Sequence, residues 1–348
     1  MKETPKVIVL CTLSTGLDSI SEVIRKGFDI SCIVGLNPKN ASPVKISGYI
    51  DIEDYATKNN LNYIYVNDYS LKDENDKYKI IKEEFDIIWV AGWQRLIPEW
   101  LINMSTMGAI GVHGSPDGIE KGRGRSPQNW SILLGCNSFN ISLFRLTPGV
   151  DNGSIINQRD FKYLEGDDIK ISYYRVSIVV ADMICELLED LSLLDKAKKQ
   201  STNAYYYPQR LPKDGYVDWN LQSNVISRHC RSMTKPYPGI RTIVDKEDIE
   251  IIMWEIIPFD NCIQGEIGQI SNCFYTNEFL VNCCNGRVLI RDWDASDKDW
   301  KPKFNTLLLS KNFSEQIENI INRHDKKYNK SQPISPRILN ALNKNIYN

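Results

Sequence analysis

The first hundred residues alternate between short apolar runs and segments in which apolar residues recur at helical spacing. A short apolar run between polar turns is typical of a buried strand, and strands that alternate with helices form a parallel sheet through right-handed crossovers. The pattern therefore predicts a Rossmann-like α/β domain, with helices on both faces of a parallel sheet. The expected strands are residues 7–11, 30–35, 63–66 and 85–91, and the expected helices are residues 17–26, 52–59 and 77–84.

The second half of the chain changes from helical spacing to short strand-like runs. A core-facing helix is expected over 169–194, and a polar linker over 196–203. Closely spaced short strands with turns between them favour a small OB-like β-barrel. The expected strands of this barrel are residues 240–244, 249–258, 267–271, 278–284 and 287–292. We therefore expect a Rossmann-like domain at 1–200, an OB-like domain at 201–310 and a tail at 311–348 that is polar and partly helical.

Composition and charge exclude several classes of function. The chain has 348 residues, a formal net charge of −2 and no apolar run long enough to span a membrane, so we expect a cytoplasmic protein without a basic bias toward nucleic acid. Nine cysteines are scattered without a CxxC pair, and the three histidines lie far apart, so no metal site is expected. The turn at 12–16 lacks the glycine fingerprint of dinucleotide-binding folds, which makes a nicotinamide cofactor unexpected.

Chemistry-bearing residues concentrate between residues 107 and 158. The apolar run 109–112 leads to His113, a loop rich in glycine, proline and arginine follows, and a second apolar run at 141–146 leads to Asp151. Both side chains would then lie just past the carboxyl end of a strand, where open α/β sheets bind ligands. A carboxylate beside an imidazole orients the ring and favours its charged form, which suits proton transfer.

A plainer interpretation of the same residues stays open. A histidine at a strand end is usually structural, and an aspartate before Asn-Gly is usually a turn former. The glycines around both residues favour a ligand site, because glycine lets the backbone approach a ligand closely.

Several motifs in this region resemble those of the folate-dependent formyltransferases, a family that includes methionyl-tRNA formyltransferase and the sugar-nucleotide N-formyltransferases. These motifs are His113-Gly-Ser-Pro, Gly122-Arg-Gly-Arg-Ser-Pro127, Pro148-Gly-Val-Asp-Asn-Gly153, Gly92-Trp-Gln-Arg-Leu-Ile-Pro98 and Lys235-Pro-Tyr-Pro-Gly239. The resemblance implies transfer of a formyl group from N10-formyltetrahydrofolate, as co-substrate, to a primary amine. It also implies catalytic roles for His113 and Asp151, folate contacts by Trp93, Arg95, Leu96, Ile97, Gly149 and Val150, and acceptor contacts by Ser115, Arg123 and Arg125.

The chain departs from the family pattern at Gly111, where the family has an asparagine two residues before the histidine. Loss of one oxyanion donor costs about 10²- to 10³-fold in rate unless another donor replaces it. Three alternatives follow. A nearby side chain such as Asn129 or Ser115 donates instead, or backbone N–H groups beside the glycine donate, or the protein binds its ligands without turnover. We favour a working enzyme, with Asn129 as a third catalytic residue.

The acceptor is the remaining question. By resemblance, initiator-tRNA enzymes carry a lysine-rich insertion after the second strand, whereas the corresponding loop here, residues 36–48, is short. Such a loop is poor at gripping a phosphodiester backbone, while the arginines at 123 and 125 suit a single diphosphate. We therefore expect a nucleotide-linked amino sugar of surface glycan synthesis, such as lipopolysaccharide or O-antigen. Methionyl-tRNA and a non-catalytic binding protein are the alternatives, and homodimer formation is left open.

Overall fold

The computed structural model describes residues 4–41, 46, 48–148, 151, 153–201 and 203–343. A seven-stranded sheet forms the N-terminal part, in the order β3-β2-β1-β4-β5-β7-β8. The strands from β3 to β5 run parallel, whereas β7 runs antiparallel to both β5 and β8. The strands are β1 (Val7–Leu10), β2 (Cys32–Leu36), β3 (Tyr63–Val66), β4 (Ile87–Val90), β5 (Gly108–Ser115), β7 (Ser138–Arg145) and β8 (Ile155–Lys162).

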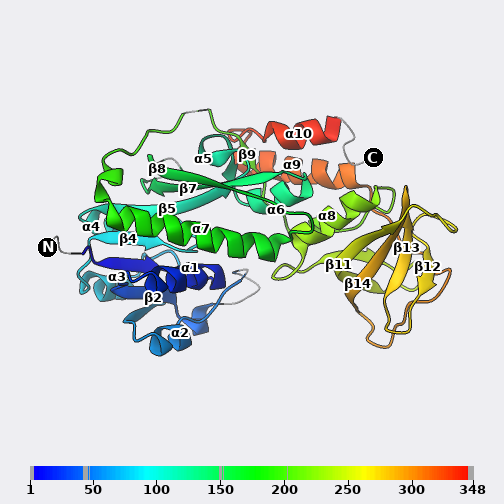
Figure 1. Ribbon diagram of the computed structural model, residues 1–348, viewed down its shortest axis with the longest axis horizontal. Coiled ribbons are helices and arrows are strands. Elements are labelled where there is room, and N and C mark those ends of the chain that lie inside the picture. Colours follow the sequence, from blue (N-terminus) through cyan, green and yellow to red (C-terminus); the bar gives the residue numbers. More distant parts are fainter. Residues whose placement is uncertain are drawn as a thin grey trace.

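Helices cover both faces of this sheet, because its central strands are apolar on both sides. In β1, Val7 and Val9 pack toward the core under α1 and α7, while Ile8 and Leu10 pack toward α3 and α4 (Figure 1). The helices of this part are α1 (Ser14–Arg25), α2 (Glu53–Lys58), α3 (Glu74–Ile81), α4 (Glu99–Met104), α5 (Gly118–Lys121), α6 (Pro127–Leu133) and α7 (Ile169–Glu189), with short 3-10 helices at Pro38–Asn40 and Leu191–Leu194.

A five-stranded antiparallel sheet forms the second part, in the order β10-β11-β14-β13-β12. Residues 305–309 join its two outer strands, since the N–H of Leu308 donates to Gly268 and the N–H of Leu309 donates to Ile243, both within 2.9 Å. This closure supports the OB-like assignment, which stays a prediction. The elements are β10 (Ile240–Ile243), β11 (Glu250–Asp260), β12 (Ile270–Cys273), β13 (Phe279–Cys283), β14 (Gly286–Ala295), the covering helix α8 (Ser223–Met233) and a 3-10 helix at Pro212–Asp214.

The C-terminal tail returns to the N-terminal part. Helices α9 (Phe313–Tyr328) and α10 (Pro336–Asn343) lie over the two-stranded ribbon of β6 (Arg123–Gly124) and β9 (Tyr206–Tyr207), near α5 and α6 (Figure 1). Phe313, Ile317 and Ile320 of α9 are buried in the core of the second part. Among the described residues, no helix is both long enough and apolar enough to cross a membrane.

The predicted α/β sheet and the run of C-terminal strands are confirmed, with three local differences. His113 lies inside β5 rather than after its end, because the strand continues to Ser115. The expected strand at 141–146 is antiparallel to β5, and its hairpin partner β8 was not predicted. The helix expected over 169–194 ends at Glu189, where the Asp190 carboxylate accepts from the N–H of Ser192 and starts a separate 3-10 turn.

Candidate active site

A cavity of about 350 Å³ lies beyond the carboxyl ends of β1 and β4. Residues 111–115 of β5 extend past the end of β4, the strand beside it. Its walls come from both faces of the sheet and from the second part of the chain. The lining includes Thr15, Gly16 and Ser19 of α1, residues 90–97 after β4, Gly111, Val112 and Gly114 of β5, residues 125–129 at the start of α6, Phe144, Leu146, Asp151, four residues of α7 and Tyr237. Most of the predicted site residues line this cavity.

His113 and Asp151 form a pair at the edge of this cavity. Nε2 of His113 lies 2.7 Å from the carbonyl oxygen of Gly122, and Nδ1 lies 3.5 Å from Oδ2 of Asp151. A carbonyl oxygen only accepts, so Nε2 carries a hydrogen and Nδ1 is the nitrogen that can share a proton with Asp151. The His113 side chain is 8% exposed and the Asp151 side chain 25%. Asp151 lines the cavity, while His113 lies behind it.

The backbone around Asp151 is held by residues that sequence reasoning did not identify. Asp151 has a φ of 49°, and its carbonyl oxygen accepts from Nε2 of Gln200 at 3.0 Å. The same amide donates to the carbonyl of Gly153 at 2.6 Å, and its oxygen accepts from Arg123 at 2.7 Å. Gln200 belongs to the segment predicted to be a polar linker, and only its tertiary contacts reveal this role.

The three residues expected to contact the acceptor divide into two groups. Ser115 is fully buried, and Arg123 is buried with its guanidinium bonded to Gln200 and to the carbonyl of Ile119. Neither lines the cavity, and their contact with the acceptor stays a prediction. Arg125 is exposed and lines the cavity.

The loop after β4 contributes the largest continuous wall. Trp93, Arg95, Leu96 and Ile97 all line the cavity, and Leu96 is 62% exposed. Trp93 also packs in the core at an edge-to-face angle on Tyr69, so its core role and its place in the wall coexist. Gly149 and Val150 lie outside the described residues.

Tyr69 fixes this loop in place. Its hydroxyl accepts from the N–H of Gln94 at 2.8 Å and lies 3.1 Å from the hydroxyl of Thr12, which in turn donates to the carbonyl of Gly92 at 2.9 Å. The guanidinium of Arg95 lies 5.1 Å above the Tyr69 ring. Tyr69 was missed because it lies alone in a polar stretch with no pattern around it.

The space beside Gly111 is filled by apolar side chains. A β-carbon placed on Gly111 would lie 2.8 Å from Cζ of Phe144 and 2.9 Å from Cδ2 of Leu146. Phe144 is only 2% exposed. An asparagine side chain therefore has no room here without movement of Phe144. The pairing of β5 with β4 ends at Ile110, so the backbone of Gly111 and Val112 lines the cavity without a strand beside it on that side.

Asn129 lies in the cavity wall at the boundary between the two parts of the chain. Its Nδ2 donates to the carbonyl of Ser232 at 2.7 Å, and its side chain also bonds to Tyr237. The hydroxyls of Tyr237 and Tyr173 lie 2.5 Å apart, and burial raises the pKa of both. These bonds occupy the Asn129 amide in interdomain contacts, which weakens its case as a free donor. Ser115 does not line the cavity, so the backbone beside Gly111 is the better placed of the proposed donors, and binding without turnover stays the other alternative.

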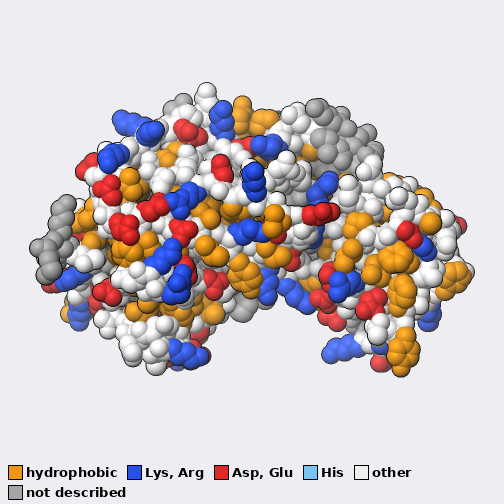
Figure 2. Space-filling model, viewed as in Figure 1, with side chains coloured by type: hydrophobic (Ala, Val, Ile, Leu, Met, Phe, Trp, Pro, Cys, Tyr) orange, Lys and Arg blue, Asp and Glu red, His pale blue; other side chains and the backbone are white. Residues whose placement is uncertain are grey.

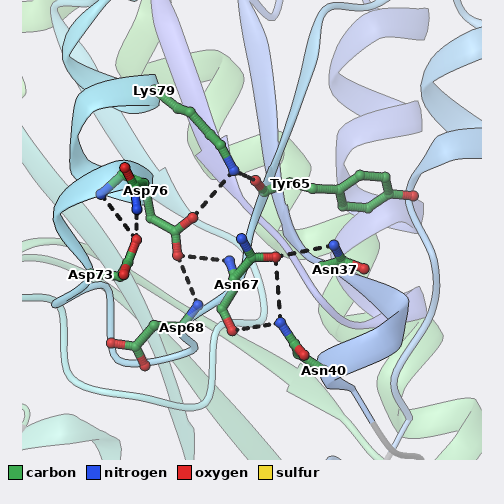
Figure 3. Close-up of polar contacts among 9 residues, drawn as sticks. Asn37, Asn40, Tyr65, Asn67, Asp68, Asp73, Asp76 and Lys79 are labelled. Atoms are coloured by element: carbon green, nitrogen blue, oxygen red, sulfur yellow. Dashed lines mark hydrogen bonds and ion pairs between the residues drawn. The ribbon is translucent and has the colours of Figure 1, made fainter.

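The ends of β2 and β3 carry a separate polar cluster (Figure 3). The buried Asp76 carboxylate accepts from the backbone N–H groups of Asn67 and Asp68 at 2.7 and 2.8 Å, and from Lys79. The Asn67 side chain then accepts from Asn37 and Asn40. These groups satisfy one another: Asp76 and Lys79 hold the segment after β3, and the amides of Asn37 and Asn40 join the start of the loop after β2 to Asn67.

Charge on the visible face is mixed. Figure 2 shows Lys and Arg side chains interspersed with Asp and Glu, without a continuous field of one sign. Among the described residues, no group of three or more His, Cys, Asp or Glu side chains could hold a metal ion. Burial raises the pKa of the Cys11 thiol to about 12, so this cysteine under the cavity is not a thiolate nucleophile at neutral pH.

Two family models match the chain. The formyl transferase model matches residues 8–186, and the formyl transferase C-terminal domain model matches residues 211–301. The first covers the seven-stranded sheet with His113 and Asp151, and the second covers α8 and the five-stranded sheet. Together they leave the tail helices α9 and α10 outside the matched region.

The individual proteins that resemble this chain carry names that refer to different activities. Over 258 residues the chain is 29% identical to the bifunctional polymyxin resistance protein ArnA of Wigglesworthia glossinidia brevipalpis, covering 72% of this chain but only 37% of that protein. It is 25% identical to the methionyl-tRNA formyltransferase of Caldicellulosiruptor saccharolyticus, over 76% of this chain and 84% of the relative. A solved N-formyltransferase from Helicobacter canadensis, complexed with folinic acid and dTDP-3-aminofucose, has a TM-score of 0.56 at 14% identity, covering 83% of this chain and 99% of its own.

Proposed function

The chain belongs to the formyl transferase family, and on that premise we propose that it moves a formyl group from N10-formyltetrahydrofolate to the primary amine of a nucleotide-linked amino sugar. One observation supports this proposal most strongly. Asp151, which is paired with His113, lines the same cavity as the loop of residues 92–97. A formyl carbon held between the two would be within reach of a carboxylate that can take up a proton.

The cavity suits a folate as co-substrate. Its volume of about 350 Å³ lies within the range of small-molecule sites, and the pterin of a folate is a flat ring system with hydrogen-bonding edges. Trp93, Ile97, Val176 and Val180 supply apolar walls, while Gln94 and Arg95 supply polar side chains. We propose that Trp93, Arg95, Leu96 and Ile97 contact the folate.

The reaction requires three events. A bond forms between the acceptor nitrogen and the formyl carbon, the bond from that carbon to N10 breaks, and one proton moves from the amine to N10. We propose that Asp151 accepts the amine proton and shares it with Nδ1 of His113, whose ring is oriented by the bond to Gly122. The backbone at Gly111 and Val112 is proposed to stabilise the oxyanion, since the side-chain donors considered are otherwise engaged.

Two features favour an amino sugar over a charged tRNA. The side chains that hold the start of the loop after β2 are the amides of Asn37, Asn40 and Asn67, which carry no charge to attract a phosphodiester backbone. The exposed Arg125 lies at the cavity, where one diphosphate could reach it. The complex of the Helicobacter canadensis enzyme with dTDP-3-aminofucose supports the same acceptor class, and surface glycan synthesis is the setting we propose for it.

The test is formyl transfer to a panel of acceptors. The protein is mixed with N10-formyltetrahydrofolate and UDP- or dTDP-linked 3- and 4-amino sugars, and release of tetrahydrofolate is followed by absorbance. We expect release with at least one sugar and none with charged initiator tRNA. Release of tetrahydrofolate with charged tRNA alone would identify the protein as a methionyl-tRNA formyltransferase. In that case tRNA binding would also weaken steeply as the salt concentration rises. Folate binding without release on any acceptor would indicate a binding protein.

Gln200→Ala is expected to lower kcat for formyl transfer by roughly tenfold or more, because small displacements of catalytic groups are costly. The substitution removes the amide that holds the carbonyls of Asp151 and Gly153, and it leaves the Arg123 guanidinium with the carbonyl of Ile119 but without the Gln200 oxygen. Steady-state rates and circular dichroism check this prediction. Lys199→Ala, a change at the exposed neighbour, serves as the control. Equal rates for Gln200→Ala and wild type would show that the Asp151 backbone holds its position unaided.

Tyr69→Phe is expected to weaken folate binding by roughly fivefold, the effect of losing about one net hydrogen bond. The phenyl ring retains its packing on Trp93, while the N–H of Gln94 loses its acceptor. The dissociation constant of 5-formyltetrahydrofolate, followed by tryptophan fluorescence, is the measurement. Tyr78→Phe, on an exposed ring of α3, is the matched control. Unchanged affinity in Tyr69→Phe would remove this loop from the folate site.

We also propose a cytoplasmic location, which the nine free cysteines support because they suit a reducing compartment. The mixed charge on the face shown in Figure 2 supports a small-molecule acceptor rather than nucleic acid. Homodimer formation and the domain limits at residues 200 and 310 stay predictions.

A further inference from the structure

A second, smaller cavity of about 90 Å³ lies on the other side of the loop that carries Arg125. Arg125 lines both cavities, so the two are separated by only a short piece of chain. The walls of the smaller cavity come from β6, β9 and helix α9 of the tail. Arg125 is the one described residue that the two cavities share.

Cationic side chains lie in the otherwise mostly apolar wall of the smaller cavity. Arg125, Arg323 and Lys327 line it, and no Asp or Glu does so among the described residues. Arg323 is neutralised by Asp214, which accepts from both of its terminal nitrogens. Arg125 and Lys327 are exposed, and neither forms an ion pair with any described carboxylate. Tyr207, Gln209 and Gln332 add neutral hydrogen-bonding groups.

The tail that provides Lys327 is built into the N-terminal part rather than attached loosely. The N–H of Tyr206 donates to the carbonyl of Pro333 at 2.8 Å, and the N–H of Ser335 donates back to Tyr206 at 3.0 Å. Arg337 and the Tyr207 hydroxyl both donate to Asp117, at 2.5 and 2.6 Å. The N–H of Arg125 donates to the carbonyl of Tyr207, so the tail, β9 and the Arg125 loop form one connected unit.

We propose that the smaller cavity is an anion subsite that receives a phosphate or carboxylate group of a ligand bound in the larger cavity, with Arg125 and Lys327 as its cations. The inference rests on the proposed function, because it extends the ligand of that site. Two sources carry such a group, namely the diphosphate of the acceptor and the glutamate carboxylates of the folate. An anion held by two cationic side chains accepts charge-assisted hydrogen bonds, which are stronger than those between neutral groups.

The test compares Lys327→Gln with Lys326→Gln, a control that removes the same charge at an exposed neighbour outside both cavities. Binding of inorganic pyrophosphate, followed by tryptophan fluorescence, is expected to weaken roughly five- to tenfold in Lys327→Gln and to stay unchanged in the control. In turnover, the KM for the affected ligand is expected to rise with kcat unchanged. A rise for the nucleotide sugar identifies the diphosphate as the source, and a rise for N10-formyltetrahydrofolate identifies the carboxylates.

Equal pyrophosphate affinity in wild type and Lys327→Gln would overturn the proposal, as would equal losses in the two variants, since the effect would then be one of general charge. These outcomes are independent of the acceptor assignment. If no amino sugar is formylated but pyrophosphate binding depends on Lys327, the subsite stands and the proposed acceptor falls. If sugars are formylated with unchanged KM values in Lys327→Gln, the acceptor stands and the subsite falls.

Discussion

Asp151→Asn is expected to lower the rate of formyl transfer by about 10²- to 10⁴-fold, the range for loss of a positioned acid or base. Asparagine keeps the size of the side chain at the cavity edge but cannot take up a proton from the attacking amine. It also removes the charge that lies 3.5 Å from Nδ1 of His113. Binding of 5-formyltetrahydrofolate is expected to stay within a few-fold of wild type, which separates proton transfer from folding.

The control for this prediction is Asp160→Asn, the same change on the exposed edge of β8. Asp160 accepts a hydrogen bond from Asn140 and lies outside the cavity, so near-wild-type rates are expected. Combining His113→Ala with Asp151→Asn should cost little more than the worse single change, because the two residues act as one unit. Additive losses would contradict a shared role in moving the proton.

Gly111→Asn, which introduces the family's usual residue, is expected to destabilise the protein by about 1–3 kcal/mol and not to raise its activity. The backbone accepts a side chain here, but the new β-carbon meets Phe144 and Leu146 below 3.0 Å. Since Phe144 is buried, relief requires repacking of the core beneath the cavity. The apparent melting temperature and the formyl transfer rate are the two measurements.

Two further variants make this prediction specific. Glu165→Asn introduces the same side chain at an exposed turn position and is expected to leave the melting temperature nearly unchanged. Gly111→Asn combined with Phe144→Ala removes the obstructing ring and should be more active than Gly111→Asn alone. A single Gly111→Asn variant that is as stable as wild type and faster would show that the apolar side chains leave room for the amide.

The local pattern of apolar and polar residues was enough to predict much of the fold. The strands β1, β2 and β4 are apolar at almost every position because both faces of the sheet are covered, and such runs are recognisable without their partners. The five C-terminal strands were likewise marked by turns at close spacing. Strand direction is not encoded in such patterns, so the antiparallel course of β7 and the strand β8 were not foreseen.

Some residues of the candidate site could likewise be predicted from the sequence, and others could not. His113 and Asp151 were identified as a pair from the motifs around them, and the structure places them 3.5 Å apart. Gln200, Tyr69 and Lys327 were missed because their roles arise only from contacts between segments distant in the chain. Arg123 shows the converse. Its neighbours in sequence suggested a ligand contact, while its tertiary partner is the Gln200 amide.

The measurement that tests the central claim most directly follows the formyl carbon itself. N10-formyltetrahydrofolate labelled with carbon-13 in the formyl group is incubated with the protein and a UDP- or dTDP-linked amino sugar, and the sugar is analysed by mass spectrometry and carbon NMR. The account predicts a labelled formamide on the sugar nitrogen with wild-type protein and none with Asp151→Asn. Label that stays on the folate with every amino sugar, in a protein that still binds folate, would contradict it.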